Sequence, residues 1–213
     1  MISDERITTY INSLDKNDNP FLTELRKKAE EDRVPIIRKE MESFIRVLFK
    51  LKEPKNILEL GSAIGYSAIL MSECISSDGK ITTIENYDKR IVQARENFKK
   101  AGKEDVITLL EGDALEIISK LDGEYDFIFM DAAKAQYINY LPHLIRLMGK
   151  GAILLTDNVL QDGDLFESRY GIIRRNRTIH TRMREYLEAV KSSNELETSI
   201  VQIGDGITLS VKL

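Results

Sequence analysis

Short apolar runs alternate with helix-like stretches from Lys55 onward, and this alternation limits the possible folds more than any other feature of the chain. The apolar runs have the length of strands, and several are rich in Ile and Phe. They cover residues 56–60, 81–84, 106–110, 125–130 and 152–155. The helix-like stretches between them cover 65–76, 88–101, 113–121 and 134–148. This pattern predicts an α/β fold in which a mainly parallel sheet carries helices on both faces, joined by right-handed crossovers.

The segment before this alternation has the pattern of helices. Asn19-Pro20 and Val34-Pro35 break it into three parts, because the residue before a proline disfavours the helical conformation. The sequence contains no repeat and no low-complexity linker. We therefore predict a single domain over 1–213, with amino-terminal helices over 1–52 and an α/β core over 53–213.

The end of the chain also departs from the alternation. A polar helix is expected over about 175–192, and two apolar runs follow at 198–203 and 207–212. Gly204-Asp205-Gly206 between these runs is a tight-turn signal. The last two strands are therefore predicted to form an antiparallel hairpin.

Composition excludes several classes of protein. With 42% hydrophobic residues over 213 positions, the chain can bury a sizeable core, and its net charge is −4. A single cysteine, Cys74, excludes an intrachain disulfide and a cysteine-based zinc site, and it fits a reducing compartment. The charged start and the absence of an apolar run near ~18 residues argue against a secretory signal and a membrane span. We expect a cytoplasmic protein with no membrane partner.

A glycine turn follows the first apolar run and leads directly into a helix: Leu60-Gly61-Ser62-Ala63-Ile64-Gly65-Tyr66-Ser67. The two glycines allow a ligand to approach the backbone, and the helix amino terminus offers free N–H groups. The G-x-x-x-G spacing differs from the dinucleotide pattern, and Glu59 would repel a pyrophosphate. An acid there suits a ligand with a positive amino group, while Ser67 offers a hydroxyl to a carboxylate. The alternative is a glycine turn without a ligand.

Acids also follow the second and third predicted strands. Glu85 lies about 25 residues after the glycine turn, where an acid can bind a ribose diol. Asp113 and Ala114 follow the third strand, where an acid and backbone groups can reach an adenine. The alternatives are a solvated strand-end glutamate and a helix N-cap. Taken together with the glycine turn, these positions favour a nucleoside-containing ligand.

Oxygen-bearing side chains follow the fourth and fifth predicted strands. Asp131 comes directly after the fourth, and Asp157 and Asn158 come directly after the fifth. Oxygen ligands of this kind suit a hard cation such as Mg²⁺. Lys134 lies one helical turn beyond Asp131. The alternatives are acids that cap helices or loops and a lysine on a helix surface.

In this order, the glycine turn, Asp131-Ala132-Ala133-Lys134 and Asp157-Asn158-Val159-Leu160 resemble the cation-dependent class I O-methyltransferases, the group of catechol and caffeoyl-CoA O-methyltransferases. The resemblance covers roughly residues 34–213. It implies a Rossmann-like fold with a seven-stranded, mostly parallel sheet and an antiparallel strand in the carboxy-terminal hairpin. It also implies S-adenosyl-L-methionine as the methyl donor, Mg²⁺ or Mn²⁺ as the metal, and a homodimer.

The resemblance assigns roles to individual residues. The residues expected to bind the cofactor are Ile37, Glu59, Gly61, Ser62, Gly65, Tyr66, Ser67, Glu85, Asp113, Ala114 and Asp131. The expected metal ligands are Asp131, Asp157 and Asn158, and the expected catalytic residues are Lys134 and Asp131. Methyl transfer needs a deprotonated, aligned oxygen, which a metal can bind and acidify while Lys134 accepts the proton.

Within this family, the sequence looks most like the bacterial tRNA 5-hydroxyuridine methyltransferases, which form 5-methoxyuridine at the wobble position. The shared segments are Val34-Pro35-Ile36, Ala63 to Ile69, Asp131 to Lys134 and Val201 to Gly206. Residues 168–184 contain six arginines and no acid, which favours a patch that binds phosphates and bases. These arginines are Arg169, Arg174, Arg175, Arg177, Arg182 and Arg184.

Three functions remain open on the sequence alone. The leading expectation is a methyltransferase whose partner is the anticodon stem-loop of tRNA. The first alternative is a small-molecule O-methyltransferase of the catechol or caffeoyl-CoA type, in which the arginines form a solvated helix face. The second alternative is a non-catalytic domain that binds RNA or cofactor, which would not need the metal set.

Overall fold

The computed structural model describes residues 5–15, 19–168 and 170–213. Its chain forms two compact units, one reaching from the amino-terminal helices to Ala114 and the other from Leu115 to Leu213. The boundary predicted at residues 52 and 53 lies inside the first unit. Within the described residues, every helix falls short of the length and apolarity that crossing a bilayer requires.

The first unit begins with three helices, as predicted. They are α1 (Glu5–Ser13), α2 (Pro20–Glu31) and α3 (Lys39–Lys52). The side chain of Asn19 caps α2 by accepting hydrogen bonds from the backbone of Phe21 and Leu22, at 2.7 and 3.2 Å. Pro20 occupies the first helical position, where its missing N–H costs nothing. This cap explains why the break at Asn19-Pro20 coincides with the start of α2, whereas Val34-Pro35 lies between the end of α2 and the start of α3.

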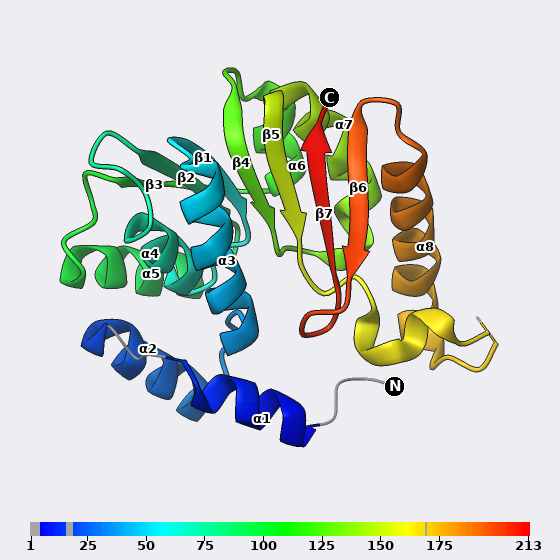
Figure 1. Cartoon of the computed structure of the whole chain (residues 1–213), viewed down its shortest axis with the longest axis horizontal. Coiled ribbons are helices and arrows are strands. Elements are labelled where there is room, and N and C mark those ends of the chain that lie inside the picture. Colours follow the sequence, from blue (N-terminus) through cyan, green and yellow to red (C-terminus); the bar gives the residue numbers. More distant parts are fainter. Residues whose placement is uncertain (1–4, 16–18, 169) are drawn as a thin grey trace. The chain divides into compact units, whose positions relative to one another are not determined.

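Three parallel strands form the sheet of the first unit in the order β3-β2-β1 (Figure 1). They are β1 (Asn56–Leu60), β2 (Lys80–Glu85) and β3 (Ile107–Glu111), with α4 (Tyr66–Ser72) and α5 (Asp88–Lys100) in the connections. In register, Leu60 faces Ile84, and Glu85 faces Glu111. The carboxyl ends of the three strands therefore lie at one edge of this sheet.

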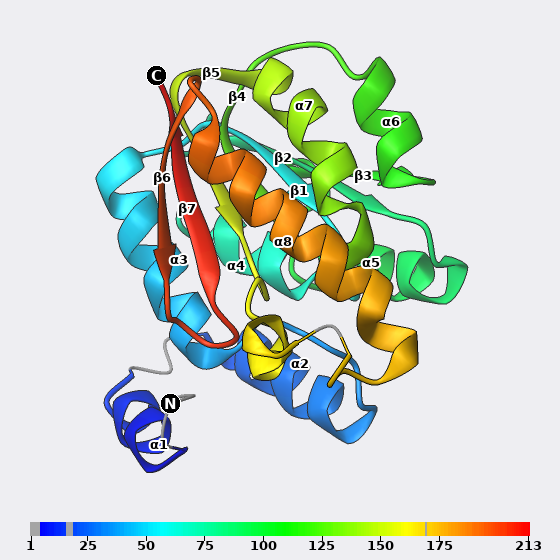
Figure 2. The ribbon, with the colours of Figure 1, turned by 90° about the vertical axis from the view of Figure 1, so that its right-hand side faces the viewer.

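The second unit holds four strands in the order β4-β5-β7-β6 (Figure 2). Its strands are β4 (Tyr125–Met130), β5 (Met148–Thr156), β6 (Leu196–Val201) and β7 (Ile207–Lys212). Its α-helices are α6 (Ala114–Lys120), α7 (Tyr137–Leu147) and α8 (Arg177–Ser192), of which α6 starts at the boundary between the units. Three short 3-10 helices are also present: η1 (Lys134–Gln136), η2 (Gln161–Phe166) and η3 (Arg174–Asn176). Strand β7 runs antiparallel to both β5 and β6, so the predicted hairpin is confirmed.

The complete strand order is β3-β2-β1-β4-β5-β7-β6, which confirms the seven-stranded, mostly parallel sheet with an antiparallel carboxy-terminal strand. Two strands differ from the sequence expectation by more than one residue, and α4 ends at Ser72 rather than at residue 76. Strand β5 begins at Met148 rather than at residue 152, because Met148 already pairs with Tyr125. Strand β6 covers Leu196–Val201 rather than 198–203, because Leu196 pairs with Lys212 and the following residues form the turn.

Candidate functional site

The glycine turn connects β1 to α4 in a conformation that needs its two glycines. Gly61 and Gly65 have φ values of 95° and 83°, in the left-handed region that glycine enters at little cost. The backbone N–H groups of Gly61 and Ser62 donate to the carbonyl of Ile84 on β2, at 3.0 and 3.1 Å. The hydroxyl of buried Ser62 has no partner among the described residues. A buried polar atom in this state fits a turn that receives a polar ligand.

Gly65 also has no room for a side chain. A Cβ added there would lie 2.4 Å from Cε1 of Phe98, whereas a Cβ at Gly102, which also has a positive φ, would meet nothing within 4 Å. We expect Gly65→Ala to lower the free energy of unfolding by about 2–4 kcal/mol and Gly102→Ala by about 1 kcal/mol. Urea unfolding of both variants measures the difference, and equal losses would show that the contact with Phe98 is unimportant.

An acid at the end of β2 joins the neighbouring loops. One carboxylate oxygen of Glu85 accepts from the backbone of Ala63 at 2.8 Å, and the other accepts from Asn86 and Tyr87, each at 3.0 Å. Exposed Asp113 lies at the end of β3, where Gly112 donates to the carbonyl of Glu85 at 2.9 Å. The structure therefore brings the predicted ribose and adenine positions to one edge of the first unit.

The acid that precedes the turn lies deeper than the sequence suggests. Glu59 is fully buried, and its two oxygens accept hydrogen bonds from the hydroxyls of Ser67 and Thr83. Ser67, which was expected to bind a ligand carboxylate, uses its proton in this pair. Glu59 therefore fixes β1, β2 and the start of α4, and direct contacts of Glu59 and Ser67 with a ligand stay predictions.

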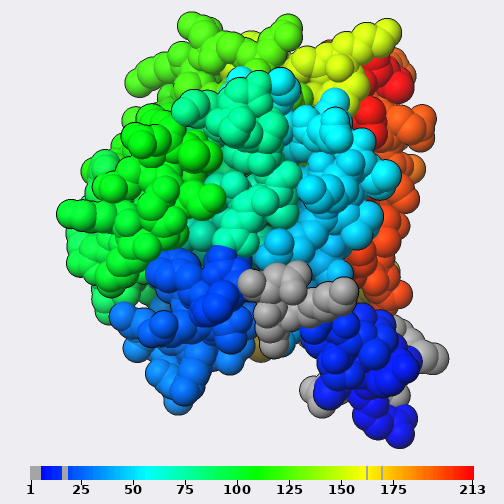
Figure 3. All heavy atoms as spheres, turned by 60° about the vertical axis from the view of Figure 1, so that its left-hand side comes forward, coloured from blue at the N-terminus to red at the C-terminus, as the bar shows by residue number. Residues whose placement is uncertain are grey.

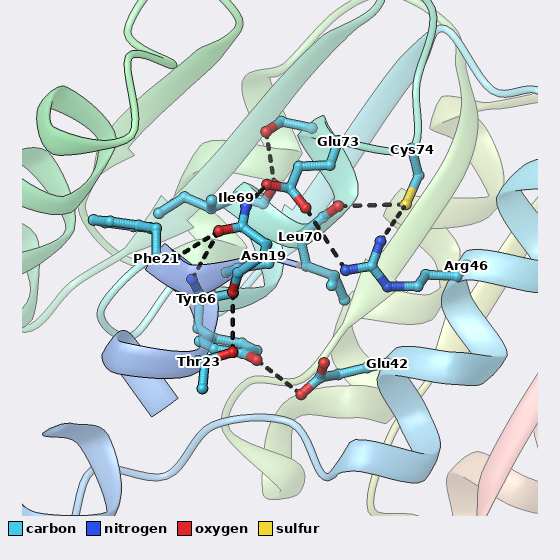
Figure 4. A network of polar contacts seen from close by, with 12 residues as sticks. Asn19, Phe21, Thr23, Glu42, Arg46, Tyr66, Ile69, Leu70, Glu73 and Cys74 are labelled. Carbon is cyan, nitrogen blue, oxygen red and sulfur yellow. Dashed lines mark hydrogen bonds and ion pairs between the residues drawn. The ribbon is translucent and has the colours of Figure 1, made fainter. Parts of the chain in front are cut away.

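Tyr66 directs its side chain toward the amino-terminal helices (Figure 4). Its hydroxyl donates to Glu42 on α3 at 2.8 Å, and the guanidinium of Arg26 lies 4.8 Å from its ring centroid. Burial, followed by the nearby charge of Glu42, raises the pKa of the Tyr66 hydroxyl above its ordinary value. Arg26 also donates to the carbonyl of buried Ile37 at 2.7 Å, so Ile37 belongs to the same polar network.

Among the three predicted metal ligands, the structure joins the side chains of Asn158 and Asp131, and it attaches Asp157 to the end of β4 through its backbone. The Asn158 side chain donates to Oδ1 of Asp131 at 3.1 Å, and the Asp157 backbone donates to the carbonyl of Met130 at 3.0 Å. Asn158 has φ +60°, a strained conformation for a residue other than glycine. Burial raises the pKa of the Asp131 carboxyl, although the hydrogen bond from Asn158 and the charge of Lys134 oppose this.

A buried tyrosine network supports this cluster from behind. The Tyr137 hydroxyl donates to the Asp157 carbonyl at 3.3 Å, and its ring meets Tyr186 edge to face, with 5.7 Å between centroids. The Tyr186 hydroxyl lies 2.6 Å from that of Thr156 on β5 and 3.1 Å from that of Thr208 on β7. Both tyrosines are fully buried, so α7 and α8 hold the ends of β5 and β7 in place.

Lys134 has a partner that lies far from it in the sequence and outside the predicted site. Its Nζ lies 3.6 Å from Oδ2 of Asp205, whose side chain is 4% exposed. Asp205 lies in the turn between β6 and β7, so the sequence indicated a turn and gave no signal for this contact. Among the described residues, no three His, Cys, Asp or Glu side chains form a metal-binding group. A cation at this cluster would therefore depend on two carboxylates and the amide of Asn158.

The arginine-rich segment is only partly exposed. Arg174, Arg175 and Arg184 are exposed, whereas Arg177 and Arg182 are half-buried. Arg177 donates to the carbonyls of Ile172 and Tyr170, each at 3.3 Å, and so fixes its own segment. Arg169 lies outside the described residues. The predicted patch therefore keeps three exposed cations within the part of the segment that the structure describes.

A mostly parallel sheet with a glycine turn after its first strand and acids at the carboxyl ends of its strands is typical of doubly wound α/β proteins, which as a class bind ligands at that edge. A family model described as O-methyltransferase matches residues 12–213. The chain therefore belongs to this O-methyltransferase family.

Individual relatives agree with this assignment. Caffeoyl-CoA O-methyltransferase 2 of Populus trichocarpa is 34% identical over 177 residues, which cover 78% of this chain and 70% of that protein. Catechol O-methyltransferase of Niastella koreensis is 34% identical over 128 residues, or 58% of each protein. The crystal structure of a Podospora anserina methyltransferase with bound SAH superposes with a TM-score of 0.89 at 25% identity, covering 98% of this chain and 94% of that one.

Proposed function

We propose that this chain transfers a methyl group from S-adenosylmethionine to a hydroxyl oxygen of its acceptor, with the help of a divalent cation. The observation that carries this proposal is the cluster of Asp131, Asp157 and Asn158 beside Lys134. Such a set is not needed by a domain that only binds RNA or cofactor. The family favours an enzyme as well.

The first unit fits the donor through the chemistry of its loop. The left-handed glycines expose backbone N–H groups, and the Ser62 hydroxyl has no partner within the described residues. Glu85 and Asp113 lie at neighbouring strand ends, where they suit a ribose and an adenine. The donor supplies a methyl group on a positive sulfur, which makes that carbon open to attack. The bound SAH of the Podospora anserina relative supports this assignment.

The second unit fits a hard cation. Two carboxylates and one amide offer only oxygen ligands, as Mg²⁺ or Mn²⁺ prefers. Burial penalises the charge of Asp131, and a bound cation would compensate this penalty. Such a cation would lower the pKa of an acceptor hydroxyl. Asn158 would need its amide oxygen turned toward the cation, an orientation that hydrogen bonding decides.

We assign the proton transfer to Lys134, whose charge acts on the neighbouring Asp131 carboxyl. In its neutral form, the Lys134 amine takes the proton of the acceptor hydroxyl and becomes an ammonium. The acceptor oxygen then forms a bond to the methyl carbon, and the carbon–sulfur electron pair returns to sulfur. The place of Lys134 on η1, three positions after Asp131, supports this role.

We propose a small hydroxylated aromatic compound of the catechol or caffeoyl-CoA kind as the acceptor. The names of the relatives from Populus trichocarpa and Niastella koreensis support this choice over the tRNA acceptor. The test offers labelled S-adenosylmethionine to the chain with catechol, caffeoyl-CoA or tRNA from cells that lack this protein, with Mg²⁺ or EDTA. Methylation of the small phenols supports the proposal, and transfer to tRNA alone overturns this choice of acceptor.

A tRNA acceptor remains the second candidate because one surface segment favours it. Phe166, Tyr170 and Ile173 are 75%, 85% and 64% exposed, and Arg174 and Arg175 directly follow Ile173. Exposed aromatic rings beside arginines suit unstacked bases and phosphates. A small phenol does not require such a segment.

Charge reversal tests this segment. If tRNA is the acceptor, Arg174→Glu with Arg175→Glu should lower kcat/KM for tRNA by about 10- to 100-fold, because two phosphate contacts become repulsive. Binding of S-adenosylmethionine, measured by calorimetry, should stay unchanged. The matched control reverses the exposed pair Lys99 and Lys100 on α5. Equal kcat/KM for tRNA in the wild type, the arginine variant and the lysine control would show that the segment does not take part in RNA recognition.

We also propose that two copies of this chain associate through α1. Four apolar side chains at helical spacing, three on α1 and one directly after it, are at least half exposed, and Figure 3 shows this helix in dark blue. They are Ile7, Tyr10, Ile11 and Leu14. An apolar row of this kind is typical of a helix that packs against a partner. Sedimentation velocity of the purified chain measures the oligomeric state directly.

A further inference from the structure

The ion pair between Lys134 and Asp205 joins two segments that are far apart in the sequence. The side chain of Lys134 is 33% exposed, whereas that of Asp205 is 4% exposed. A carboxylate at this depth is poorly screened by water, so it holds a nearby lysine Nζ more firmly than a surface acid does, whether the amine is neutral or charged. Lysine otherwise has a long, flexible side chain that occupies many rotamers.

The turn that carries Asp205 is itself attached to the loop that carries Asp157 and Asn158. The backbone of Leu160 donates to the carbonyl of Asp205 at 2.8 Å, and that of Val159 donates to the carbonyl of Gly206 at 3.0 Å. Gly206 has φ +76°, and a Cβ there would lie 2.2 Å from Cγ of Leu160. The turn and the loop after β5 therefore hold a fixed relative position.

We propose that Asp205 is a positioning residue, which holds the amine of Lys134 in place beside the oxygen cluster. This inference rests on the proposed methyl transfer and adds to it the residue that orients the base. Asp205 suits this role because its own backbone is anchored to the segment that carries two of the proposed metal ligands. One rigid element thus sets the position of the lysine nitrogen relative to Asp157 and Asn158.

If Asp205 had only a structural role, its replacement would have a different effect. In that case, replacing it would weaken the turn and lower stability, and the loss would be the same whether or not Lys134 is present. A positioning residue acts through Lys134, so its replacement should have little further effect once Lys134 is gone. A double-mutant cycle separates these two cases.

The cycle uses Asp205→Asn, Lys134→Met and the double variant in the full chain, with the acceptor that the wild-type enzyme methylates. We expect Asp205→Asn to lower kcat about 10- to 100-fold, because a misplaced base loses alignment. KM and the affinity for S-adenosylmethionine should change less than about twofold. In the Lys134→Met background, Asp205→Asn should change kcat less than about twofold. The control is Ser210→Ala, which removes the buried hydroxyl that accepts from Thr198 in the same hairpin at 2.8 Å.

Thermal unfolding of the same four proteins provides a readout that needs no acceptor. The Tm loss on Asp205→Asn should be smaller in the Lys134→Met background, because the pair is already broken there. Additive effects on kcat would overturn the proposal, and so would additive effects on Tm. A wild-type chain that methylates no acceptor would instead overturn the proposed function, and the Tm cycle alone would then decide whether Asp205 holds Lys134. A drop in kcat for Ser210→Ala as large as that for Asp205→Asn would also contradict a specific role.

Discussion

Asp157→Ala is expected to lower methyl transfer at saturating Mg²⁺ by about a thousandfold or more, because it removes one of two carboxylates from the proposed cation site. A cation held by Asp131 and Asn158 alone would bind weakly and would acidify the acceptor less. Two measurements check this expectation: the initial rate with labelled S-adenosylmethionine, and the affinity for Mn²⁺ from its paramagnetic resonance signal.

The matched control is Asp126→Ala, which removes an acid near the start of β4, the strand whose other end precedes Asp131. This variant should keep both its rate and its Mn²⁺ affinity. Wild-type enzyme treated with EDTA should behave like Asp157→Ala and recover when Mg²⁺ returns. Full activity of Asp157→Ala, or of the wild type in EDTA, would contradict a cation at this cluster.

Lys134→Met is expected to lower kcat by about 100- to 10,000-fold, because the acceptor hydroxyl loses the group that takes its proton. The methionine side chain is similar in length but cannot accept a proton, so the affinity for S-adenosylmethionine should remain within about twofold. Steady-state rates and calorimetry measure the two quantities.

Lys150→Met on β5 is the control for this prediction, because Lys150 is exposed and lies near the start of that strand. It should leave kcat unchanged. A Lys134→Met variant that retains the wild-type rate would show that another group, or water bound to the cation, removes the proton. A variant that loses donor affinity together with kcat would place Lys134 in the cofactor site instead.

The sequence predicted the alternation of strands and helices and the carboxy-terminal hairpin, because both follow from local patterns. Strands β4 and β7 begin and end where their apolar runs do. The extension of β5 back to Met148 was missed because Gly149 and Gly151 weaken the strand signal, and the pairing with β4 overrides this local preference. The glycine turn and the acids that follow the strands could be grouped into one candidate site, because parallel strands bring their carboxyl ends to the same edge of a sheet.

The finer contacts could not be predicted, because they join residues that are distant in the sequence. The Tyr66 hydroxyl meets Glu42, and the Ser67 hydroxyl meets Glu59, so neither side chain adopts the simple ligand-facing role that its position suggested. Asp205 reads as a turn residue in the sequence, and only the fold places it beside Lys134. Side-chain partners of this kind depend on tertiary packing, about which a single sequence contains little information.

The antiparallel direction of β7 has a practical consequence for anyone who labels this enzyme. Because β7 runs opposite to β5, it starts near the proposed site and carries the chain away from it, and Leu213 is 59% exposed. A fluorescent or affinity tag fused after Leu213 should therefore leave turnover intact, whereas even a short epitope inserted between β6 and β7 should abolish it.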